Sequence, residues 1–294
     1  MDKIVRWPGG LCALFIAAGC ATQPPGGPHP ATSHDSAHVT FLGHESLLVT
    51  HGGTGVLVDP FYFDWPDVFD VMPNDVKAKA FRGEAPFDGV QTVLVTHVHG
   101  DHFFSRDLLH WLDLHPQGRV ILPRQGYDRL ASEPSATTQT LARLVAVDAV
   151  DGEPSTFTYG GLRIEAPVVR HIDIGRPQEV MEHVAYRVTL NGRATFSHLG
   201  DADPSRAIYA SQQAFWGART SDVTFVPYWF FTEGDVDVLR DLNATHAVAI
   251  HLQSVRPEQV DGLNAPYFLR PMATCEIGLP ADARPEQAAA CGSR

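Results

Sequence analysis

An α/β fold in a single domain is predicted by two features of the sequence. Short apolar segments rich in β-branched residues alternate with helix-like segments along most of the chain. Four of the apolar segments end on His or Asp side chains, and a sheet gathers such side chains along one edge. A chain of 294 residues can bury a sizeable core, and the even spread of these segments favours one domain over residues 38–294.

The elements are expected in a regular order along the chain. Strands are expected near 38–42, 46–50 and 56–59, before an irregular stretch that ends at about residue 90. A strand and a helix follow across 91–115, with Ser105 as the helix cap. The later elements are strands within 155–170, a hairpin that turns at Asn191–Gly192, a helix at 204–213, a strand at 223–227, a helix at 235–242 and a strand at 247–252.

Four metal-competent side chains are crowded into six positions directly after the apolar strand at 91–96. They are His97, His99, Asp101 and His102, and Gly100 relaxes the backbone between them. Imidazole nitrogens and a carboxylate, without a thiolate, suit a borderline ion such as zinc in a catalytic site, with iron or manganese as alternatives. A purification tag does not explain the pattern, because a tag is an uninterrupted run at a terminus. The segment therefore predicts a metal site.

Three later strands each end on one further candidate ligand. The segment 162–170 leads to His171, the segment 194–200 to Asp201, and the segment 246–250 to His251. Each of these residues also has a structural interpretation. A histidine at a strand end is often only hydrogen-bonded, and Asp201 could cap the helix expected near residue 204.

The chain resembles the metallo-β-lactamase superfamily of hydrolases. The resemblance rests on the HxHxDH box at 97–102, which is followed in order by His171, Asp201 and His251. It implies an αββα sandwich with two zinc ions and one bridging carboxylate, that of Asp201. The implied ligands are His97, His99 and His171 for the first ion, and Asp101, His102 and His251 for the second. The opening segments 39–49 and 56–60 look like the branch of ascorbate-phosphate lactonases and N-acyl phosphatidylethanolamine phospholipase D.

Hydrolysis by a hydroxide that bridges two zinc ions is the activity that the resemblance implies. A small ester-like substrate is expected, either a lactone or a phosphodiester, because a bridging acid such as Asp201 is typical of the esterase and phosphodiesterase branches. Asp101 is also expected to act as a catalytic residue that orients the hydroxide or passes a proton. Two alternatives stay open: a β-lactamase-type amide hydrolase, and a non-catalytic metal-binding lipoprotein of the envelope.

The remaining histidines are interpreted as structural, and His44 also has a second interpretation. His44 lies in the family-like turn at 43–44 and could reach the mouth of the site. Asp59 is expected to accept a hydrogen bond from a ligand imidazole and so fix its tautomer. The other histidines in this class are His183, His198 and His246.

Three further features are possible substrate contacts. The aromatic segments 61–66 and 228–231 could bind an acyl chain or a sugar ring, or could pack in the core. His183 or Arg176 could meet a substrate anion.

The amino terminus predicts a bacterial lipoprotein. Residues 1–19 read as a signal peptide, because Lys3 and Arg6 precede an apolar stretch that is too short to span a bilayer. Small residues before Cys20 predict that this cysteine is lipidated, although an ordinary signal peptide is the alternative. The Pro- and Gly-rich residues 20–37 read as a flexible tether. The expected location is the cell envelope, at the periplasmic face of the outer membrane.

The net charge and the cysteines limit which partners and covalent bonds the chain can have. The formal net charge of −12 and the absence of a basic run disfavour nucleic acid as a partner, but they allow a small anionic substrate. Cys275 and Cys291 could form a disulfide in an oxidising compartment, or remain as free thiols. The oligomeric state is left open by the sequence.

Overall fold

Two mixed β-sheets form the centre of the structure, a computed structural model that describes residues 36–148, 154–173, 175, 180–254, 263 and 265–278. The first sheet has seven strands in the order β13-β1-β2-β3-β4-β5-β6, and the second has six in the order β12-β11-β10-β9-β8-β7. The strands of the first sheet are β1 (Ala37–Gly43), β2 (Ser46–His51), β3 (Thr54–Val58), β4 (Val90–Leu94), β5 (Arg119–Pro123), β6 (Leu144–Val147) and β13 (Thr274–Ile277). Those of the second are β7 (Ser155–Tyr159), β8 (Leu162–Ala166), β9 (Tyr186–Leu190), β10 (Ala194–His198), β11 (Val223–Pro227) and β12 (Ala247–Ile250).

Eight helices lie within the described residues. Those that follow strands of the first sheet are α1 (Asn74–Arg82), α2 (Ser105–Leu114), α3 (Arg124–Ala131) and α4 (Thr138–Leu141). Those that follow strands of the second are α5 (Arg206–Ser211), α6 (Gln213–Trp216), α7 (Trp229–Thr232) and α8 (Val236–Asp241). In this part of the chain no helix is both long and apolar enough to cross a membrane.

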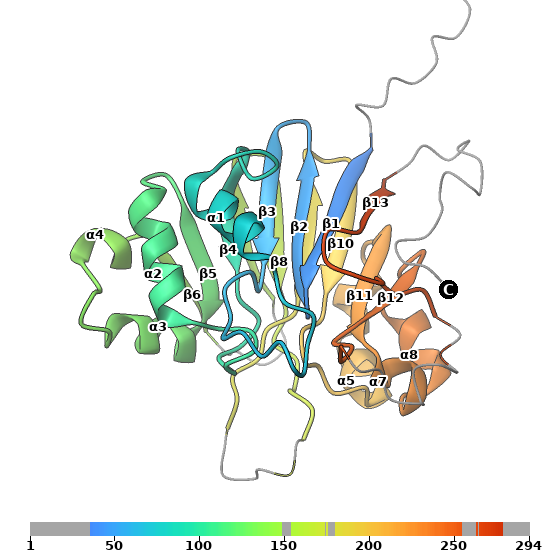
Figure 1. Cartoon of the computed structure of the whole chain (residues 1–294). Helices are drawn as coiled ribbons and strands as arrows, with labels where there is room; N and C mark the ends of the chain where they lie inside the picture. Colours follow the sequence, from blue (N-terminus) through green and yellow to red (C-terminus); the bar gives the residue numbers. More distant parts are fainter. Residues whose placement is uncertain are drawn as a thin grey trace, which may run out of the picture. The chain divides into compact units, whose positions relative to one another are not determined.

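Three apolar clusters hold the layers together. The central cluster joins the facing sides of the two sheets, with Val49 of β2 and Phe196 of β10 among its members. A second cluster packs the outer side of the first sheet against α1, α2 and α3, around Trp111. A third packs the outer side of the second sheet against α5 to α8, around Trp216. Figure 1 shows these helices on opposite sides of the paired sheets, so the expected αββα layer order is confirmed.

Strand direction decides where the polar side chains gather. Strands β3, β4 and β5 run parallel in the first sheet, and β10, β11 and β12 run parallel in the second. Both faces of these strands are buried, so nearly every residue along them is apolar. The carboxyl ends of β3, β4, β10 and β12 each lead directly into a candidate site residue or segment.

The expected strands and the Asn191–Gly192 hairpin are present, but three expectations about helices were wrong in detail. The stretch expected to be irregular before residue 90 contains α1, which follows Pro73, buries Val76 and Ala80, and ends at Gly83 in the left-handed conformation. Ser105 is not the cap of α2 but its first residue, because the chain turns into the helix at Phe104. The helix expected at 204–213 is shorter and breaks into α5 and α6.

Several predictions about the two ends of the chain lie outside the described residues. These include the signal peptide, Cys20, most of the tether and Cys291. Cys275 lies on β13, which pairs with β1, and it is disulfide-bonded. Its pairing with Cys291 stays a prediction, because Cys291 lies outside the described residues.

Candidate metal centre

Two groups of metal-competent side chains meet at the sheet edge. The first group comprises His97, His99 and His171, with Asp201 beside them, and the second group comprises His44, Asp101, His102 and His251. Within each group the candidate ligand atoms lie within 4.8 Å of one another. All seven residues predicted as ligands therefore lie close together. His44, which was interpreted as structural, lies among them.

The first group is built from the loop after β4 and from the segment that follows β8. His97 Nε2 lies 3.0 Å from His99 Nδ1, and His171 Nε2 lies 3.4 Å from Asp201 Oδ2. A single bridge between His171 and Ala202, with a hydrogen bond from the Ile172 amide to the Asp201 carbonyl, fixes the His171 segment against the Asp201 loop. Two segments that are far apart in sequence thus present their ligands to one point.

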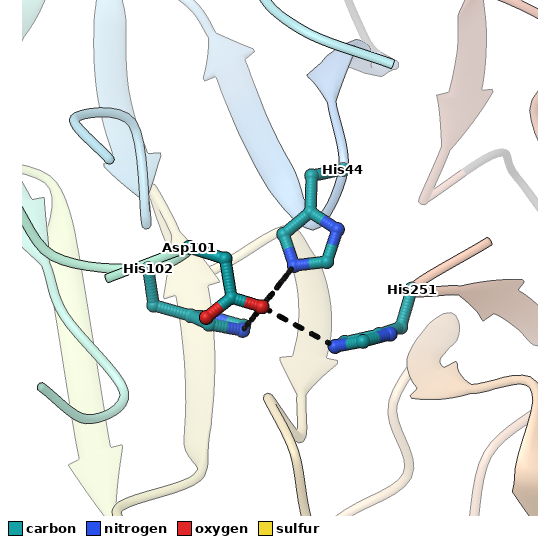
Figure 2. Close-up of side chains that lie close together, drawn as sticks. All are labelled: His44, Asp101, His102 and His251. Atoms are coloured by element: carbon teal, nitrogen blue, oxygen red, sulfur yellow. Dashed lines mark hydrogen bonds and ion pairs between the residues drawn. The ribbon is translucent and has the colours of Figure 1, made fainter. Parts of the chain in front are cut away.

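The second group is built from three separate segments, as Figure 2 shows. His44 lies in the turn between β1 and β2, Asp101 and His102 lie in the loop after β4, and His251 directly follows β12. Asp101 Oδ2 is 3.4 Å from His44 Nε2 and 3.8 Å from His251 Nε2. The side chains of all four converge on one small volume.

Asp201 lies between the two groups and offers one oxygen to each. Its Oδ2 atom is 3.7 Å from His97 Nε2 and faces the first group. Its Oδ1 atom is 3.1 Å from His102 Nε2 and 3.3 Å from His251 Nε2, in the second group. One carboxylate can therefore contact two ions, which offsets part of their mutual repulsion.

Asp59 contacts a histidine of the second group in the way that was predicted for it. Its Oδ2 atom is 2.9 Å from His102 Nδ1, so His102 can donate this hydrogen bond and keep Nε2 for the centre. The Thr96 amide and hydroxyl both donate to Asp59, at 2.8 and 2.6 Å. The Thr96 oxygen is also 3.0 Å from His97 Nδ1, so this network touches both groups.

Protonation differs between the two groups. Burial, followed by the neighbouring His102, holds the pKa of His97 well below its usual value, and burial also lowers the pKa of His99. Burial acts on His102 too, but the charges of Asp201 and Asp101 and the hydrogen bond to Asp59 raise its pKa well above the usual value. His97 and His99 are thus neutral and ready to bind a cation at neutral pH, whereas His102 carries a proton when no metal competes for it.

Two residues of the site were missed by sequence reasoning. His44 was interpreted as structural, and the signal for it was its place in the Gly43–His44 turn. Glu45 is completely buried, and neither of its carboxylate oxygens makes a hydrogen bond in the described part of the protein. Burial, followed by the charge of Asp201, raises the pKa of Glu45 well above its usual value. Glu45 therefore adds a buried carboxyl group of raised pKa behind the second group.

The other histidines keep their structural interpretation. His183 is buried, with Nδ1 3.2 Å from the Val169 carbonyl, so it is not available to a substrate anion. His198 lies 2.9 Å from the Glu45 carbonyl, and His246 begins the segment before β12. Arg176, the other candidate for a substrate anion, lies outside the described residues.

The aromatic segments divide between the core and the surface. Phe61 is fully buried, whereas Phe63 and Trp65 are 52% and 42% exposed. Trp65 stacks near Phe69, whose ring centroid is 3.9 Å from that of His44 and 5.3 Å from that of His251. In the later segment, Trp229 packs 4.8 Å from His251. Rings therefore reach from the surface to the second group.

The donor set fits divalent metal ions. It consists of imidazole nitrogens and carboxylate oxygens without thiolates, a set that suits zinc, iron or manganese. His171 Nε2 is buried and makes no hydrogen bond of good geometry within the described residues. Buried polar atoms are almost always satisfied, so this atom indicates a partner that is not a protein group.

Comparison with known proteins agrees with this geometry. Residues 38–251 match the family model described as the beta-lactamase superfamily domain. A UPF0173 metal-dependent hydrolase from Heliobacterium modesticaldum is 26% identical over 198 residues, which cover 65% of this chain and 70% of that protein. One from Nitratidesulfovibrio vulgaris is 44% identical over 64 residues, only 22% of each chain.

Similar folds occur in solved structures with different activities. Igni18, a metallo hydrolase from Ignicoccus hospitalis, has a TM-score of 0.57 at 18% identity and covers 83% of this chain and all of that one. The CmlA β-hydroxylase from Streptomyces venezuelae has a TM-score of 0.51 at 16% identity and covers 86% of this chain and 55% of that one. These likenesses concern the fold, and a fold supports more than one chemistry. With the family model and the hydrolase relatives, they identify the chain as a metal-dependent hydrolase of the metallo-β-lactamase superfamily.

Proposed function

We propose that the protein is a dinuclear zinc hydrolase that cleaves a small ester-like bond, in a lactone or a phosphodiester. The observation that carries the proposal is the position of Asp201, which presents one oxygen to each group of side chains. When bound, two zinc ions would supply Lewis acidity and a water of lowered pKa. Manganese or iron is the alternative pair of ions for the same donor set.

The residues of the chain have separate tasks in this proposal. His97, His99 and His171 would hold the first ion, the second group would supply the ligands of the second ion, and Asp201 would contact both. Asp59 holds the His102 ring in the orientation that leaves Nε2 free for the centre. Asp101 is the proposed catalytic residue. Its pKa is held below the usual range, despite burial, chiefly by the charge of His102, so its carboxylate stays ionised and can orient the nucleophile by accepting a hydrogen bond.

The branch and the location belong to the same proposal. The opening segments support a place near the ascorbate-phosphate lactonases and N-acyl phosphatidylethanolamine phospholipase D. A lipid on Cys20 would hold the enzyme at the periplasmic face of the outer membrane. The exposed rings of Phe63 and Trp65 support an apolar part of the substrate near the second group.

The test is hydrolysis by the full chain loaded with two equivalents of Zn²⁺. We expect turnover of bis(p-nitrophenyl) phosphate or of a simple γ-lactone, and none of nitrocefin. His99→Ala should lower kcat/KM by about 10³-fold, because several kcal/mol of charge stabilisation are lost with a metal ion. The matched control is His110→Ala, since His110 is exposed on α2 and belongs to neither group, and the kcat/KM of this variant should stay unchanged.

Two results would replace the proposal with one of its alternatives. Turnover of nitrocefin alone would identify a β-lactamase-type amide hydrolase. Stoichiometric zinc without turnover of any of these substrates, and with His99→Ala indistinguishable from the parent, would favour a non-catalytic metal-binding lipoprotein of the envelope.

A further inference from the structure

His44 occupies a position that the packing of the chain fixes closely. It lies in the turn between β1 and β2 and is 1% exposed. The preceding Gly43 has a φ of +128°, and a Cβ atom there would lie 2.6 Å from the backbone oxygen of Asp70. Only glycine fits this approach, so the turn is held against the 70–72 segment. The side chain of His44 is thereby directed into the second group, as Figure 2 shows.

The separations between the side-chain atoms of the second group match those of ligands around one ion. His44 Nε2 is 3.4 Å from both Asp101 Oδ2 and His102 Nε2. Asp101 Oδ2 is 3.9 Å from His102 Nε2. Ligand atoms about 2.1 Å from one ion lie about 3.0 Å apart at right angles and about 3.4 Å apart at the tetrahedral angle. The observed separations of 3.4 to 3.9 Å lie at or somewhat above this range before any adjustment to an ion.

A hydrogen bond from His44 Nε2 explains the positions of the neighbouring atoms less well than a shared metal ion does. His44 Nε2 faces the Asp101 oxygen and the His102 nitrogen at the same distance, and one N–H can be directed well to only one of them. His102 Nε2 is also 3.1 Å from Asp201 Oδ1. An ion among these atoms would use the lone pairs of all of them at once.

Backbone strain links His44 to residues already assigned to the centre. His44, Asp59 and His251 have φ values of 50°, 44° and 61°, in the left-handed region that residues other than glycine seldom adopt. Such strain persists only where the surrounding structure imposes it, and it gathers at functional sites. His44 therefore shares this conformation with a ligand candidate and with a residue that orients one.

We propose that His44 is a fourth side-chain ligand in the second group. The second ion would then be held by His44, Asp101, His102 and His251 in addition to the shared Asp201, whereas the first ion has three histidines and Asp201. The first ion is thus left with the more open coordination for substrate. This inference rests on the dinuclear centre of the proposed function.

The test replaces His44 with asparagine, which tolerates a positive φ and removes the imidazole. The full chain is titrated with Co²⁺, and bound metal is measured directly. The parent protein should bind two ions. His44→Asn should bind the first ion as the parent does and the second at least about 100-fold more weakly, since even partners of ligands contribute 10- to 100-fold. His51→Asn is the matched control, because His51 is a buried histidine outside both groups that bonds Asn191, and it should bind two ions normally.

A second measurement uses the unmodified protein and does not depend on the folding of a variant. In the Co²⁺ form, each ligand imidazole gives one hyperfine-shifted N–H resonance in the proton NMR spectrum. The three histidines of the first group with His102 and His251 would give five resonances, and His44 makes six. The Nδ1 atom of His44 is buried, so its proton should be protected from rapid exchange.

The outcomes separate this inference from the proposed function. Six resonances, with weakened second-site binding in His44→Asn, support ligation by His44. Five resonances in a protein that binds two ions would overturn the inference and leave the dinuclear centre intact, as would normal second-site affinity in His44→Asn. Binding of a single ion by the parent protein would contradict the dinuclear proposal itself.

Discussion

The two groups of the metal centre draw on the same box at 97–102, yet they are built differently. In the first group, burial lowers the pKa values of His97 and His99, and the ring neighbours include another histidine, His183. The second group combines segments from three parts of the chain, a protonated His102 and the rings of Phe69 and Trp229. The difference indicates that the first group is nearly ready for a cation, whereas the second must first release a proton.

Asp201 joins the groups, so removing it should have the largest effect. Asp201→Ala should weaken both ions and lower kcat/KM by about 10³-fold or more, because several kcal/mol of charge stabilisation depend on each metal. Metal content and kcat/KM would be measured together, with the exposed Asp88→Ala as the control. If one ion still bound with the affinity of the parent protein, the carboxylate would not be shared and the two groups would be independent.

Asp59 and Thr96 offer a way to weaken the groups separately. Asp59→Asn removes the charge that orients His102 and should weaken the second ion by about 10- to 100-fold. The affinity for the first ion should fall less, because Asp59 contacts His97 only indirectly, through the Thr96 hydroxyl. Thr96→Val, which keeps the side-chain shape, should mainly weaken the first ion through His97. Calorimetric metal titrations would measure both, and equal effects on the two ions in both variants would show that this network does not distinguish them.

The pH dependence of metal binding should show a smaller and graded difference. Below the raised pKa of His102, affinity for the second ion should fall by about tenfold per pH unit, since the ion must displace that proton. The first ion should respond less over the same range, because the pKa values of His97 and His99 are lowered. Zinc titrations at a series of pH values would measure the two slopes, and parallel slopes would contradict the assignment of the proton to His102.

The same proton has a consequence for the metal-free protein. A raised pKa of His102 in the folded state stabilises that state fully below the unfolded value, and this contribution is lost as pH rises through the folded pKa. Thermal unfolding of the metal-free protein should therefore show this contribution declining with increasing pH.

Strands were easier to predict than helices in this chain. The hairpin at Asn191–Gly192 could be predicted because both residues adopt positive φ, which Asn and Gly tolerate. Helix α1 was missed because it buries only Val76 and Ala80, too few apolar positions to reveal a helical period. No strand or helix was predicted between residues 119 and 147, although β5 and β6 extend the first sheet there. Strand β13 forms four residues at the edge of the sheet, and its pairing with β1 depends on contacts across the whole chain.

The sequence by itself determined the layer class of the fold and seven candidate ligands, because ligands that directly follow apolar strands can be recognised from local pattern. The tertiary structure alone decided that His44 and Glu45 lie among them. The Gly43–His44 turn was only a weak local signal for His44, and Glu45 had none, since His44 reaches its neighbour His102 across 58 residues. Their environment arises from the approach of β1, β4 and β12 at one edge, and burial and charge at that edge exist only once the sheets have formed.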